Sequence, residues 1–247
     1  MRLYGLIGYP LGHSFSQQYF SEKFAREGIT DARYELFPLE NIAGLPLLLS
    51  QHPDLRGLNV TIPHKETVVP FLHELDETAR AVGAVNCIKI ENQRLKGFNT
   101  DVIGFEKSLK TMDAHAKHDG TKALILGTGG ASKAVAYVLK KRGIPFQFVS
   151  RNPAGENQIS YAAVHRLPSA VYRLIINTTP LGMSPHKDTC PDLPFERLSP
   201  QHLVYDLVYN PAETLLLQRA KKQGCAVKNG LEMLYLQAEA AWQIWNS

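Results

Sequence analysis

The sequence lacks several features that would place the chain in a specialised class of protein. Its three cysteines, Cys87, Cys190 and Cys225, are far apart and form no C-x-x-C pair, so neither a disulfide framework nor a metal site is expected. This use of cysteine favours a reducing compartment, and we predict a cytoplasmic protein. No apolar run is long enough to cross a bilayer, and the N-terminal stretch is too short and too rich in glycine for a signal peptide.

Long blocks of one charge are also missing. The largest basic cluster is "KKR" at 140–142, at the expected end of a helix, where cations suit the helix dipole. At a net charge of +4, nucleic-acid binding is not favoured, and a phosphorylated or carboxylated small molecule suits the charge as well. The 247-residue chain, 44% hydrophobic, is long enough for one large or two modest domains, and we expect a monomer or a homodimer.

Strand-like and helix-like segments alternate along the chain, which is typical of α/β proteins whose parallel sheets are covered by helices. The segments expected to be strands are 3–9, 33–37, 58–62, 122–126, 145–149, 173–177, 203–209 and 225–228, with a hairpin over 85–98. Helices are expected over 14–27, 40–50, 77–83, 101–112, 130–142 and 230–245, and from Asn210-Pro211 onwards. The stretch "DAHAKHDG" at 113–120 interrupts the pattern, which indicates two domains.

The strongest local signal is the glycine-rich turn in "ALILGTGGAS". A buried strand over 123–126 runs into Gly127, Thr128, Gly129 and Gly130, and a helix with Ala131 and Ser132 in its first turn follows at once. Gly127 permits the tight turn, and Gly129 lets the backbone approach a pyrophosphate at the helix N-terminus. We therefore predict a dinucleotide site, with a tight turn that binds no ligand as the alternative.

The next strand lacks the acidic residue that binds the ribose 2′-hydroxyl of NAD. Ser150, Arg151 and Asn152 stand at its end instead. A guanidinium binds a 2′-phosphate through planar, charge-assisted hydrogen bonds, so we predict NADP rather than NAD. A solvated Arg151 is the alternative, because arginine is usually exposed.

Polar residues in the amino-terminal half collect where strands are expected to end. Ser14 and Ser16 follow the first strand, where hydroxyls beside free helix N–H groups suit a carboxylate, although one of them could be a simple N-cap. The other members are Asn59 and Thr61 on one side of their strand, Asn86, and the run Asn99, Thr100 and Asp101. Open α/β sheets bind ligands at the carboxyl ends of their strands, so we expect these residues to form a site.

Lys65 and Asp101 are the pair in this set that can move a proton. Lys65 comes just past the buried strand in "NVTIPHK". An aspartate beside a lysine raises the pKa of the ammonium, while desolvation lowers it again. A lysine balanced in this way exchanges a proton with an alcohol as a hydride leaves the adjacent carbon. Taken alone, Asp101 would more often be a helix cap.

In their order along the chain, these motifs resemble the shikimate dehydrogenase family. The matching segments are "HSFS", "NVTIPHK", "GAVN", "NTD", "GTGGAS", "SRN", "YDLVYNPAETLLL" and "NGLEMLYLQ". They run from about Gly8 to Gln237. The resemblance implies an NADP-dependent, reversible reduction of 3-dehydroshikimate to shikimate in the synthesis of aromatic amino acids. It also implies that Lys65 is the acid/base and Asp101 its partner.

The resemblance further implies a fold and a set of binding residues. An N-terminal substrate-binding domain, 1–103, is expected to take back the last helix, 230–247, and a Rossmann-type NADP domain is expected at 104–229. The implied substrate residues are Ser14, Ser16, Asn59, Thr61, Asn86, Tyr209 and Gln237. The implied cofactor residues are Gly127 to Ser132, Ser150, Arg151, Asn152, Thr178, Met183, Leu207, Gly230 and, less centrally, Glu77.

The chain departs from the family pattern at three places. Gln17 replaces a usual proline, Glu232 stands where glycine is common, and the segment after Asn152 lacks a long amphipathic helix. The nearest rival activity is a shikimate/quinate dehydrogenase with relaxed cofactor use. A methyltransferase that binds S-adenosylmethionine would want an acidic residue in place of Arg151. A non-catalytic NADP-binding regulator would have no use for a proton-transfer pair.

Overall fold

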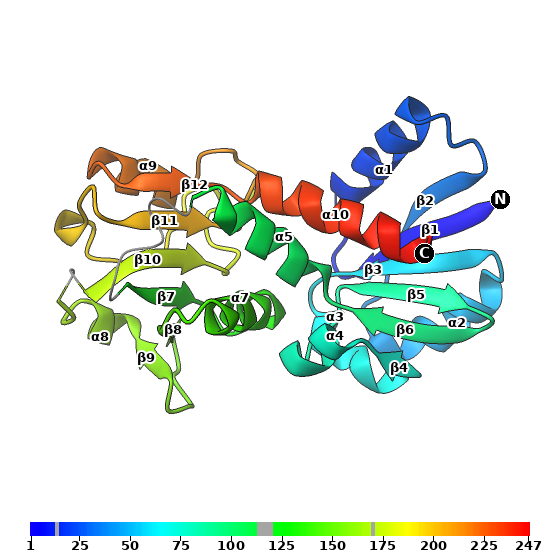
Figure 1. Ribbon diagram of the computed structural model, residues 1–247, viewed down its shortest axis with the longest axis horizontal. Coiled ribbons are helices and arrows are strands. Elements are labelled where there is room, and N and C mark those ends of the chain that lie inside the picture. Colours follow the sequence, from blue (N-terminus) through cyan, green and yellow to red (C-terminus); the bar gives the residue numbers. More distant parts are fainter. Residues whose placement is uncertain (13–14, 113–120, 169–170) are drawn as a thin grey trace. The chain divides into compact units, whose positions relative to one another are not determined.

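The computed structural model describes residues 1–12, 15–112, 121–168 and 171–247 (Figure 1). Within these ranges the chain forms two compact units, Met1–Thr100 with Ala238–Ser247, and Asp101–Gln237. The domain limits expected from the sequence, 1–103 with 230–247 and 104–229, remain a prediction. None of the helices in the described ranges is long and apolar enough to span a bilayer.

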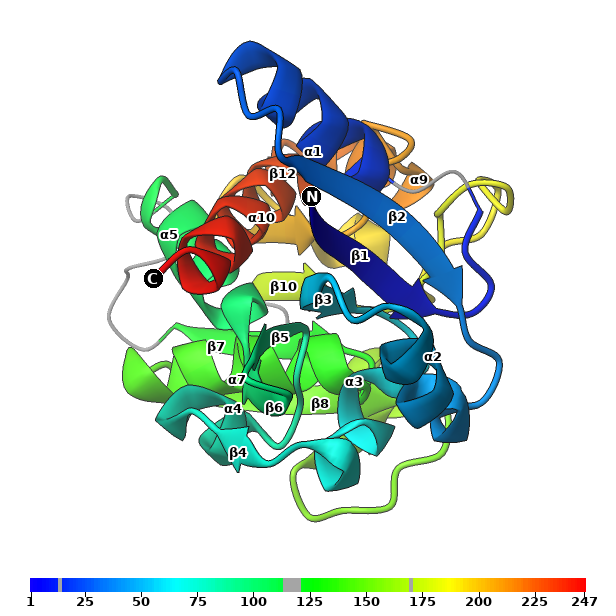
Figure 2. The same cartoon turned by 90° about the vertical axis from the view of Figure 1, so that its right-hand side faces the viewer.

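The first unit is built on a six-stranded sheet with the order β2-β1-β3-β5-β6-β4. Its strands are β1 (Arg2–Gly8), β2 (Ala32–Pro38), β3 (Leu55–Val60), β4 (Glu74–Leu75), β5 (Cys87–Glu91) and β6 (Arg94–Phe98). Strands β2, β1 and β3 run parallel, as Figure 2 shows for β1 and β2. The expected hairpin is confirmed, because β5 pairs with β3 and β6 in antiparallel fashion.

Helices cover both faces of this first sheet. Helix α1 (Phe15–Arg26) and the end of α10 (Leu231–Trp245) cover one face, where Tyr4 stacks on Trp245 with 4.9 Å between ring centroids. Successive strand residues point to opposite faces, so Leu3 packs on the other side, in one cluster with Leu45 of α2 (Leu45–Gln51). The predicted return of the last helix to the first domain is confirmed.

Short helical elements complete the first unit. They are two 3₁₀ turns, Ile42–Gly44 and Val69–Phe71, and the helices α3 (His64–Thr67) and α4 (Glu77–Val82). Asp76 caps α4, the helix expected over 77–83, by accepting hydrogen bonds from the backbone N–H groups of residues 78 and 79. Gly83 ends the helix with a left-handed φ of 70°.

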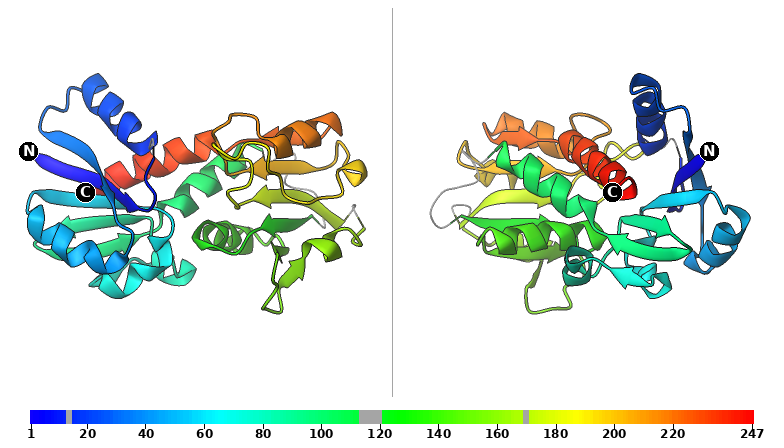
Figure 3. Two further views of the ribbon diagram at one scale, coloured as in Figure 1. Left: turned by 180° about the vertical axis from the view of Figure 1, so that it is seen from behind. Right: turned by 45° about the vertical axis from the view of Figure 1, so that its right-hand side comes forward.

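The second unit contains six parallel strands in the order β12-β11-β10-β7-β8-β9. They are β7 (Lys122–Leu126), β8 (Phe146–Ser150), β9 (Gln158–Ser160), β10 (Tyr172–Asn177), β11 (Leu203–Asp206) and β12 (Ala226–Lys228). This is the strand order of the dinucleotide-binding fold, which reverses direction between β7 and β10. Its helices are α5 (Thr100–Lys110), α7 (Gly130–Lys141), α8 (Tyr161–Val164) and α9 (Leu215–Lys222), shown from two further sides in Figure 3.

Helices also cover both faces of the second sheet. Val204 of β11 belongs to the core cluster that includes Leu216 and Leu217 of α9. The next residue, Tyr205, points to the opposite face, and its ring centroid lies 5.4 Å from that of Phe105 on α5. The predicted α/β class with helices on both faces of parallel sheets is therefore confirmed.

Two connections in the second unit bear on the sequence analysis. Helix α9 does not begin at Asn210-Pro211, as expected, but at Leu215, because the Thr214 hydroxyl caps it by accepting from the backbone N–H of Leu217. Strands β8 and β9 are joined by residues 151–157 without a helix, in agreement with the predicted absence of a long helix there. Parallel strands usually need a longer crossover.

Candidate active site

In the first unit, the predicted polar residues lie at one edge of the sheet. Ser16 is in the first turn of α1, the helix that follows β1 in the chain, and Asn59 is the penultimate residue of β3. Asn86 immediately precedes β5, which runs antiparallel to β3, and Thr100 follows β6. The carboxyl ends of β1, β3 and β6 therefore share an edge with the start of β5, and all four residues lie there.

A buried tyrosine that sequence analysis missed connects two of these residues. The Tyr34 hydroxyl donates to Oδ1 of Asn59 at 2.8 Å and also forms a hydrogen bond with Ser16. Burial raises the pKa of Tyr34 well above its usual value, so the phenol stays protonated and keeps donating. Tyr34 lies on β2, and no local motif marks it, because its role arises from the pairing of β2 with β1.

Asn86 holds the start of α5 with both ends of its side chain. Its Nδ2 donates to Oγ1 of Thr100 at 2.9 Å, and its Oδ1 accepts from the Thr100 backbone N–H at 2.6 Å. Its own carbonyl accepts from the backbone N–H of Val60 at 2.9 Å. Asn86 is 3% exposed, so this buried residue connects β3 to α5 through hydrogen bonds.

The same segment fixes the backbone of Lys65. The N–H of Val85 donates to the Lys65 carbonyl at 2.7 Å, which ties α3 to the residue before Asn86. Lys65 is half-buried, and Asp101, the residue after Thr100, is 5% exposed. Hydrogen bonds within the first unit therefore link the backbone of Lys65, through residues 85 and 86, to Thr100.

Thr61 lies one residue beyond the end of β3 rather than within it, yet its N–H still donates to the carbonyl of Ile7 at 2.9 Å. This continues the ladder with β1 and keeps Thr61 beside Gly8, at the end of that strand. Ser14 lies outside the described residues. Asn99 is buried and donates to the carbonyl of Ala84 at 2.8 Å, which indicates a structural role for its side chain.

In the second unit, the glycine-rich loop lies where the strand order reverses. Gly127 follows β7 with a φ of 109°, and a Cβ on it would lie 2.8 Å from Oγ1 of Thr178, the residue after β10. Thr178 in turn donates to the carbonyl of Leu126 at 2.7 Å. Only glycine fits this turn, which brings the loops after β7 and β10 together.

The backbone at Gly129 faces open space. Apart from Gly129 itself and its two chain neighbours, no atom of the described residues lies within 4 Å of a Cβ built on Gly129, and the residue is the N-cap of α7, a helix of 12 residues. Ser132 is buried, and its hydroxyl donates to the Gly129 carbonyl at 2.6 Å. Thr128 is exposed, while Gly130 and Ala131 are half-buried. An uncapped helix end next to a bare backbone fits a dinucleotide pyrophosphate.

The predicted 2′-phosphate residues follow β8. The Ser150 hydroxyl accepts from the backbone N–H of Asn152 at 3.2 Å, which holds the turn that presents Arg151. Arg151 and Asn152 are exposed. Burial raises the pKa of the nearby Tyr161 hydroxyl, and the positive charge of Arg151 opposes that rise.

The remaining predicted cofactor residues divide between the units. A Cβ on Gly230 would lie 2.0 Å from the carbonyl oxygen of Leu207, so these two segments touch through bare backbone. Met183 is 43% exposed in the loop after β10. Glu77 belongs to the first unit, as the exposed first residue of α4.

The two implied substrate residues of the second unit are partly buried. Burial raises the pKa of the Tyr209 hydroxyl, so it remains a donor at neutral pH. Gln237 lies on α10, and its Nε2 donates to the carbonyl of Leu234 at 3.0 Å.

A buried carboxylate that sequence analysis missed organises the loops after β10 and β11. Asp206 is 0% exposed and accepts from Nδ2 of Asn177 at 2.9 Å, from the N–H of Val208 at 3.0 Å and from the Thr214 hydroxyl at 2.5 Å. Burial raises its pKa, and these three donors oppose the rise. Asp206 thereby fixes the loop that carries Leu207 and Tyr209.

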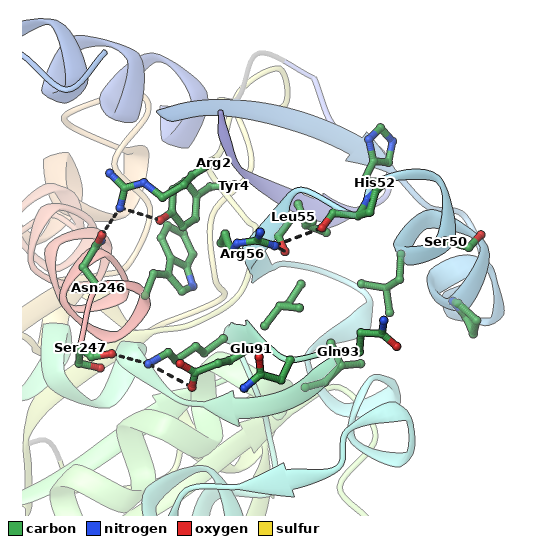
Figure 4. A pocket seen from close by; sticks show the side chains of 18 residues that line it. Arg2, Tyr4, Ser50, His52, Leu55, Arg56, Glu91, Gln93, Asn246 and Ser247 are labelled. Atoms are coloured by element: carbon green, nitrogen blue, oxygen red, sulfur yellow. Dashed lines mark hydrogen bonds and ion pairs between the residues drawn. The ribbon is translucent and has the colours of Figure 1, made fainter. Parts of the chain in front are cut away.

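A separate groove of about 930 Å³ lies at the opposite, amino-terminal edge of β1 and β3 (Figure 4). Its basic side chains are held by the protein: Arg2 donates to Asp31 and Asn246, and Arg56 donates to the carbonyl of Leu55. Of the predicted site residues that the structure describes, none lines this groove. Among the described residues, no cluster of three or more His, Cys, Asp or Glu side chains could hold a metal ion.

Comparison with known proteins gives a consistent result. Residues 6–88 match the family model described as shikimate dehydrogenase substrate binding domain. The shikimate dehydrogenase (NADP(+)) of Desulforamulus reducens is 36% identical over 98% of this chain and 88% of its own.

Solved structures agree. The chorismate mutase/shikimate 5-dehydrogenase fusion protein of Clostridium acetobutylicum is 38% identical, with a TM-score of 0.88 over 99% of this chain and 91% of the other. The shikimate 5-dehydrogenase of Thermus thermophilus in complex with NADP(H) and shikimate is 30% identical, with a TM-score of 0.84 over 99% of this chain and 93% of the other. With its two units and their polar edges, the chain belongs to the shikimate dehydrogenase family.

Proposed function

We propose that this protein catalyses the reversible, NADP-dependent reduction of 3-dehydroshikimate to shikimate, with Lys65 as the acid/base and Asp101 as its partner. The observation that supports this most directly is the hydrogen-bonded edge of the first sheet. There, Asn86 and Val85 hold both the backbone of Lys65 and the start of the helix that carries Asp101. The reaction is the oxidoreductase step of the family, in the pathway to aromatic amino acids.

The substrate is rich in hydroxyl groups and carries a carboxylate, so its site must supply many hydrogen-bonding partners. We assign this role to Ser14, Ser16, Thr61, Asn86, Tyr209 and Gln237. Asn59 acts through Tyr34, because its Oδ1 accepts from the Tyr34 hydroxyl that also bonds Ser16. A site built to pair each hydroxyl rejects analogues that leave its polar groups unpaired.

The chemical step needs one proton at the carbonyl oxygen. When bound, NADPH would supply the hydride for the ketone carbon. The Lys65 ammonium donates a proton to the oxygen of that ketone as negative charge develops there, which leaves a neutral amine and the alcohol. The Asp101 carboxylate orients the ammonium and stabilises its charge. In the oxidation direction, Lys65 accepts the hydroxyl proton.

On the cofactor side, we assign the pyrophosphate to the backbone of residues 127–132 and the 2′-phosphate to Ser150, Arg151 and Asn152. The open backbone at Gly129 supports the first assignment and the exposed guanidinium supports the second. Thr178, Met183, Leu207 and Gly230 form the nicotinamide side, with Glu77 as a peripheral member.

The experiment is a steady-state assay of reduced nicotinamide absorbance, with shikimate or quinate against NADP or NAD. We expect shikimate with NADP to give the highest kcat/KM. Lys65→Ala should lower kcat by about 10²- to 10⁴-fold and change the KM for shikimate little, because general acid catalysis contributes in that range. Lys89→Ala, at the opposite groove of the same unit, is the matched control. Normal turnover by Lys65→Ala would refute its role, and a preference for quinate would reassign the substrate.

Two finer expectations also remain proposals. We propose a cytoplasmic location, which the three free thiols support because they suit a reducing compartment. Burial raises the pKa of Cys190 to about 11, so this thiol is poorly reactive at neutral pH. We also propose a monomer or a homodimer, which light scattering after gel filtration distinguishes.

A further inference from the structure

A glycine in the middle of α5 has no local explanation. Gly104 lies inside the helix Thr100–Lys110, away from both ends. Glycine at such a position costs about 1 kcal/mol relative to alanine. A benefit outside the helix is therefore expected.

The benefit is a close approach of α10. A Cβ built on Gly104 would lie 2.6 Å from the carbonyl oxygen of Met233, 3.1 Å from Cβ of Gln237 and 3.2 Å from the backbone nitrogen of Gln237. Two of these three atoms belong to the backbone of α10, which no rotamer change can move. The two helices touch at this point because residue 104 has no side chain.

The register of the two helices places two proposed site residues at this contact. Asp101 precedes Gly104 by three residues and so lies on the same face of α5. Farther along that face, Ser108 and Thr111 donate to Oε2 of Glu232, in the first turn of α10. The helices thus run antiparallel, and Asp101 lies on the side of α5 that faces Gln237.

Glu232, in the first turn of α10, connects that helix to the C-terminal end of α5. Besides the hydroxyls of Ser108 and Thr111, it binds Nζ of Lys228 at the end of β12. Ser108 also shares a hydrogen bond of 2.6 Å with the buried Tyr205 hydroxyl. Figures 1 and 3 show the beginning of α10 alongside α5. Helices α5 and α10 are therefore held together by the hydrogen bonds of Glu232, and the distance between them is set where Gly104 contacts α10.

We propose that Gly104 is a positioning residue that sets the distance between the Asp101 carboxylate and the Gln237 carboxamide. The inference rests on the proposed roles of those two residues. A side chain at position 104 would push α10 away from α5 and separate a group that orients the ammonium from a group that binds the substrate. A displacement of this kind lowers the rate of the catalysed reaction steeply.

Gly104→Ala tests the proposal, because alanine is the better helix former and any loss must come from the contact with α10. We expect kcat/KM for shikimate to fall by about 10- to 100-fold, with both a lower kcat and a higher KM. The dissociation constant for NADP, measured by titration without shikimate, should stay the same, because the loop at 127–132 does not touch Gly104. Ser108→Ala is the control: it removes one hydrogen bond between α5 and α10 and one to Tyr205 of β11 but adds no volume, so it should lower stability and leave kcat/KM near wild type.

A double-mutant cycle with Gln237→Ala separates positioning from general damage. If Gly104 acts through Gln237, the effect of Gly104→Ala shrinks when Gln237 is already alanine, whereas additive effects contradict the proposal. Unchanged kcat/KM in a folded Gly104→Ala protein would also overturn it.

Gln237→Asn tests the spacing without touching Gly104, in case the alanine variant does not fold. Shortening this side chain by one methylene should cost nearly as much activity as Gln237→Ala, and full activity would refute the importance of the distance. If Asp101→Asn and Gln237→Ala are themselves fully active, the proposed site fails, which is a different result from failure at Gly104 alone.

Discussion

At the scale of single residues, Arg151 tests the cofactor assignment most directly. Its exposed guanidinium stands at the end of β8, where the connection to β9 is short and contributes no helix. A hydrogen bond to a charged group contributes about 1.5–3 kcal/mol, so Arg151→Ala should weaken NADP binding by about 10- to 100-fold and leave NAD binding nearly unchanged. Titration of both cofactors measures this. Arg219→Ala, which removes the same charge from α9, is the control, and equal losses for both cofactors would contradict the assignment.

Replacing two glycines of the second unit by alanine should affect different properties, stability at Gly230 and NADP affinity at Gly129. At Gly230 the new Cβ would lie 2.0 Å from the Leu207 carbonyl oxygen, so Gly230→Ala should lower the free energy of unfolding by about 1–3 kcal/mol. At Gly129 the φ is an ordinary −83° and the described residues leave the new methyl group free, so stability should stay near wild type. NADP affinity should nevertheless fall, because the methyl group takes the space proposed for the pyrophosphate. Denaturant melts and cofactor titration measure both effects, and a destabilised Gly129→Ala would be inconsistent with the open backbone.

At the scale of elements, α1 and the end of α10 are joined by a buried charge. The Lys23 side chain is 5% exposed, and its Nζ contacts Oε1 of Glu27 at 2.8 Å and Oε2 of Glu239 at 3.0 Å. Glu239→Gln leaves this ammonium with one carboxylate, so it should lower the free energy of unfolding by about 1–3 kcal/mol. Glu74→Gln breaks an exposed pair with Lys96 and is the control, with a clearly smaller expected loss, because exposed ion pairs contribute little to stability. Equal losses in both variants would contradict the importance of burial.

The same cluster predicts a pH dependence of stability. Burial lowers the pKa of Lys23, but hydrogen bonds to Glu27 and Glu239 outweigh that effect, and the net pKa is raised above 10.5. A raised pKa in the folded state means that the stabilisation is complete at neutral pH and is lost as the pH rises through the raised value. Urea midpoints should therefore decline more steeply above pH 10 in the wild type than in Glu239→Gln. Parallel curves would contradict this.

The sequence was sufficient to predict those elements whose signals are local. The helices expected over 77–83 and 101–112 are found as α4 and α5. Asp76 and Gly83 delimit α4, and Val102, Phe105 and Leu109 of α5 are buried. The start of α9 was mispredicted because a proline after an asparagine is a strong local signal. The real cap, Thr214, is held by Asp206, a contact across the fold that no sequence window contains.

The site shows the same division between local and distant determinants. The glycine-rich loop and the polar edge of the first sheet were predicted from motifs. Tyr34 and Asp206 were missed, because burial and pairing between strands give them their roles. Gly104 did leave a signal in the sequence, since a glycine in the interior of an expected helix often has a packing reason.

At the scale of the whole molecule, each unit has its own core, and the two should respond differently to ligand. Both tryptophans, Trp242 and Trp245, belong to the first unit, whereas the loop at 127–132 belongs to the second. NADP at 100 times its dissociation constant stabilises what it binds by about 2.7 kcal/mol. We expect it to shift the urea transition seen by circular dichroism more than the one seen by tryptophan fluorescence. Coincident curves that shift together would show a single cooperative unit.

Trp245 ties the end of the chain to its beginning. Its indole lies where a side chain on Gly57 would otherwise be, and its Nε1 donates to the carbonyl of Ile88 at 3.0 Å. A ribosome releases the strands of the first sheet long before it adds this tryptophan. The nascent protein must therefore carry an unfinished, aromatic-lined surface past the synthesis of the entire second unit, and during that interval it is a natural client for chaperones.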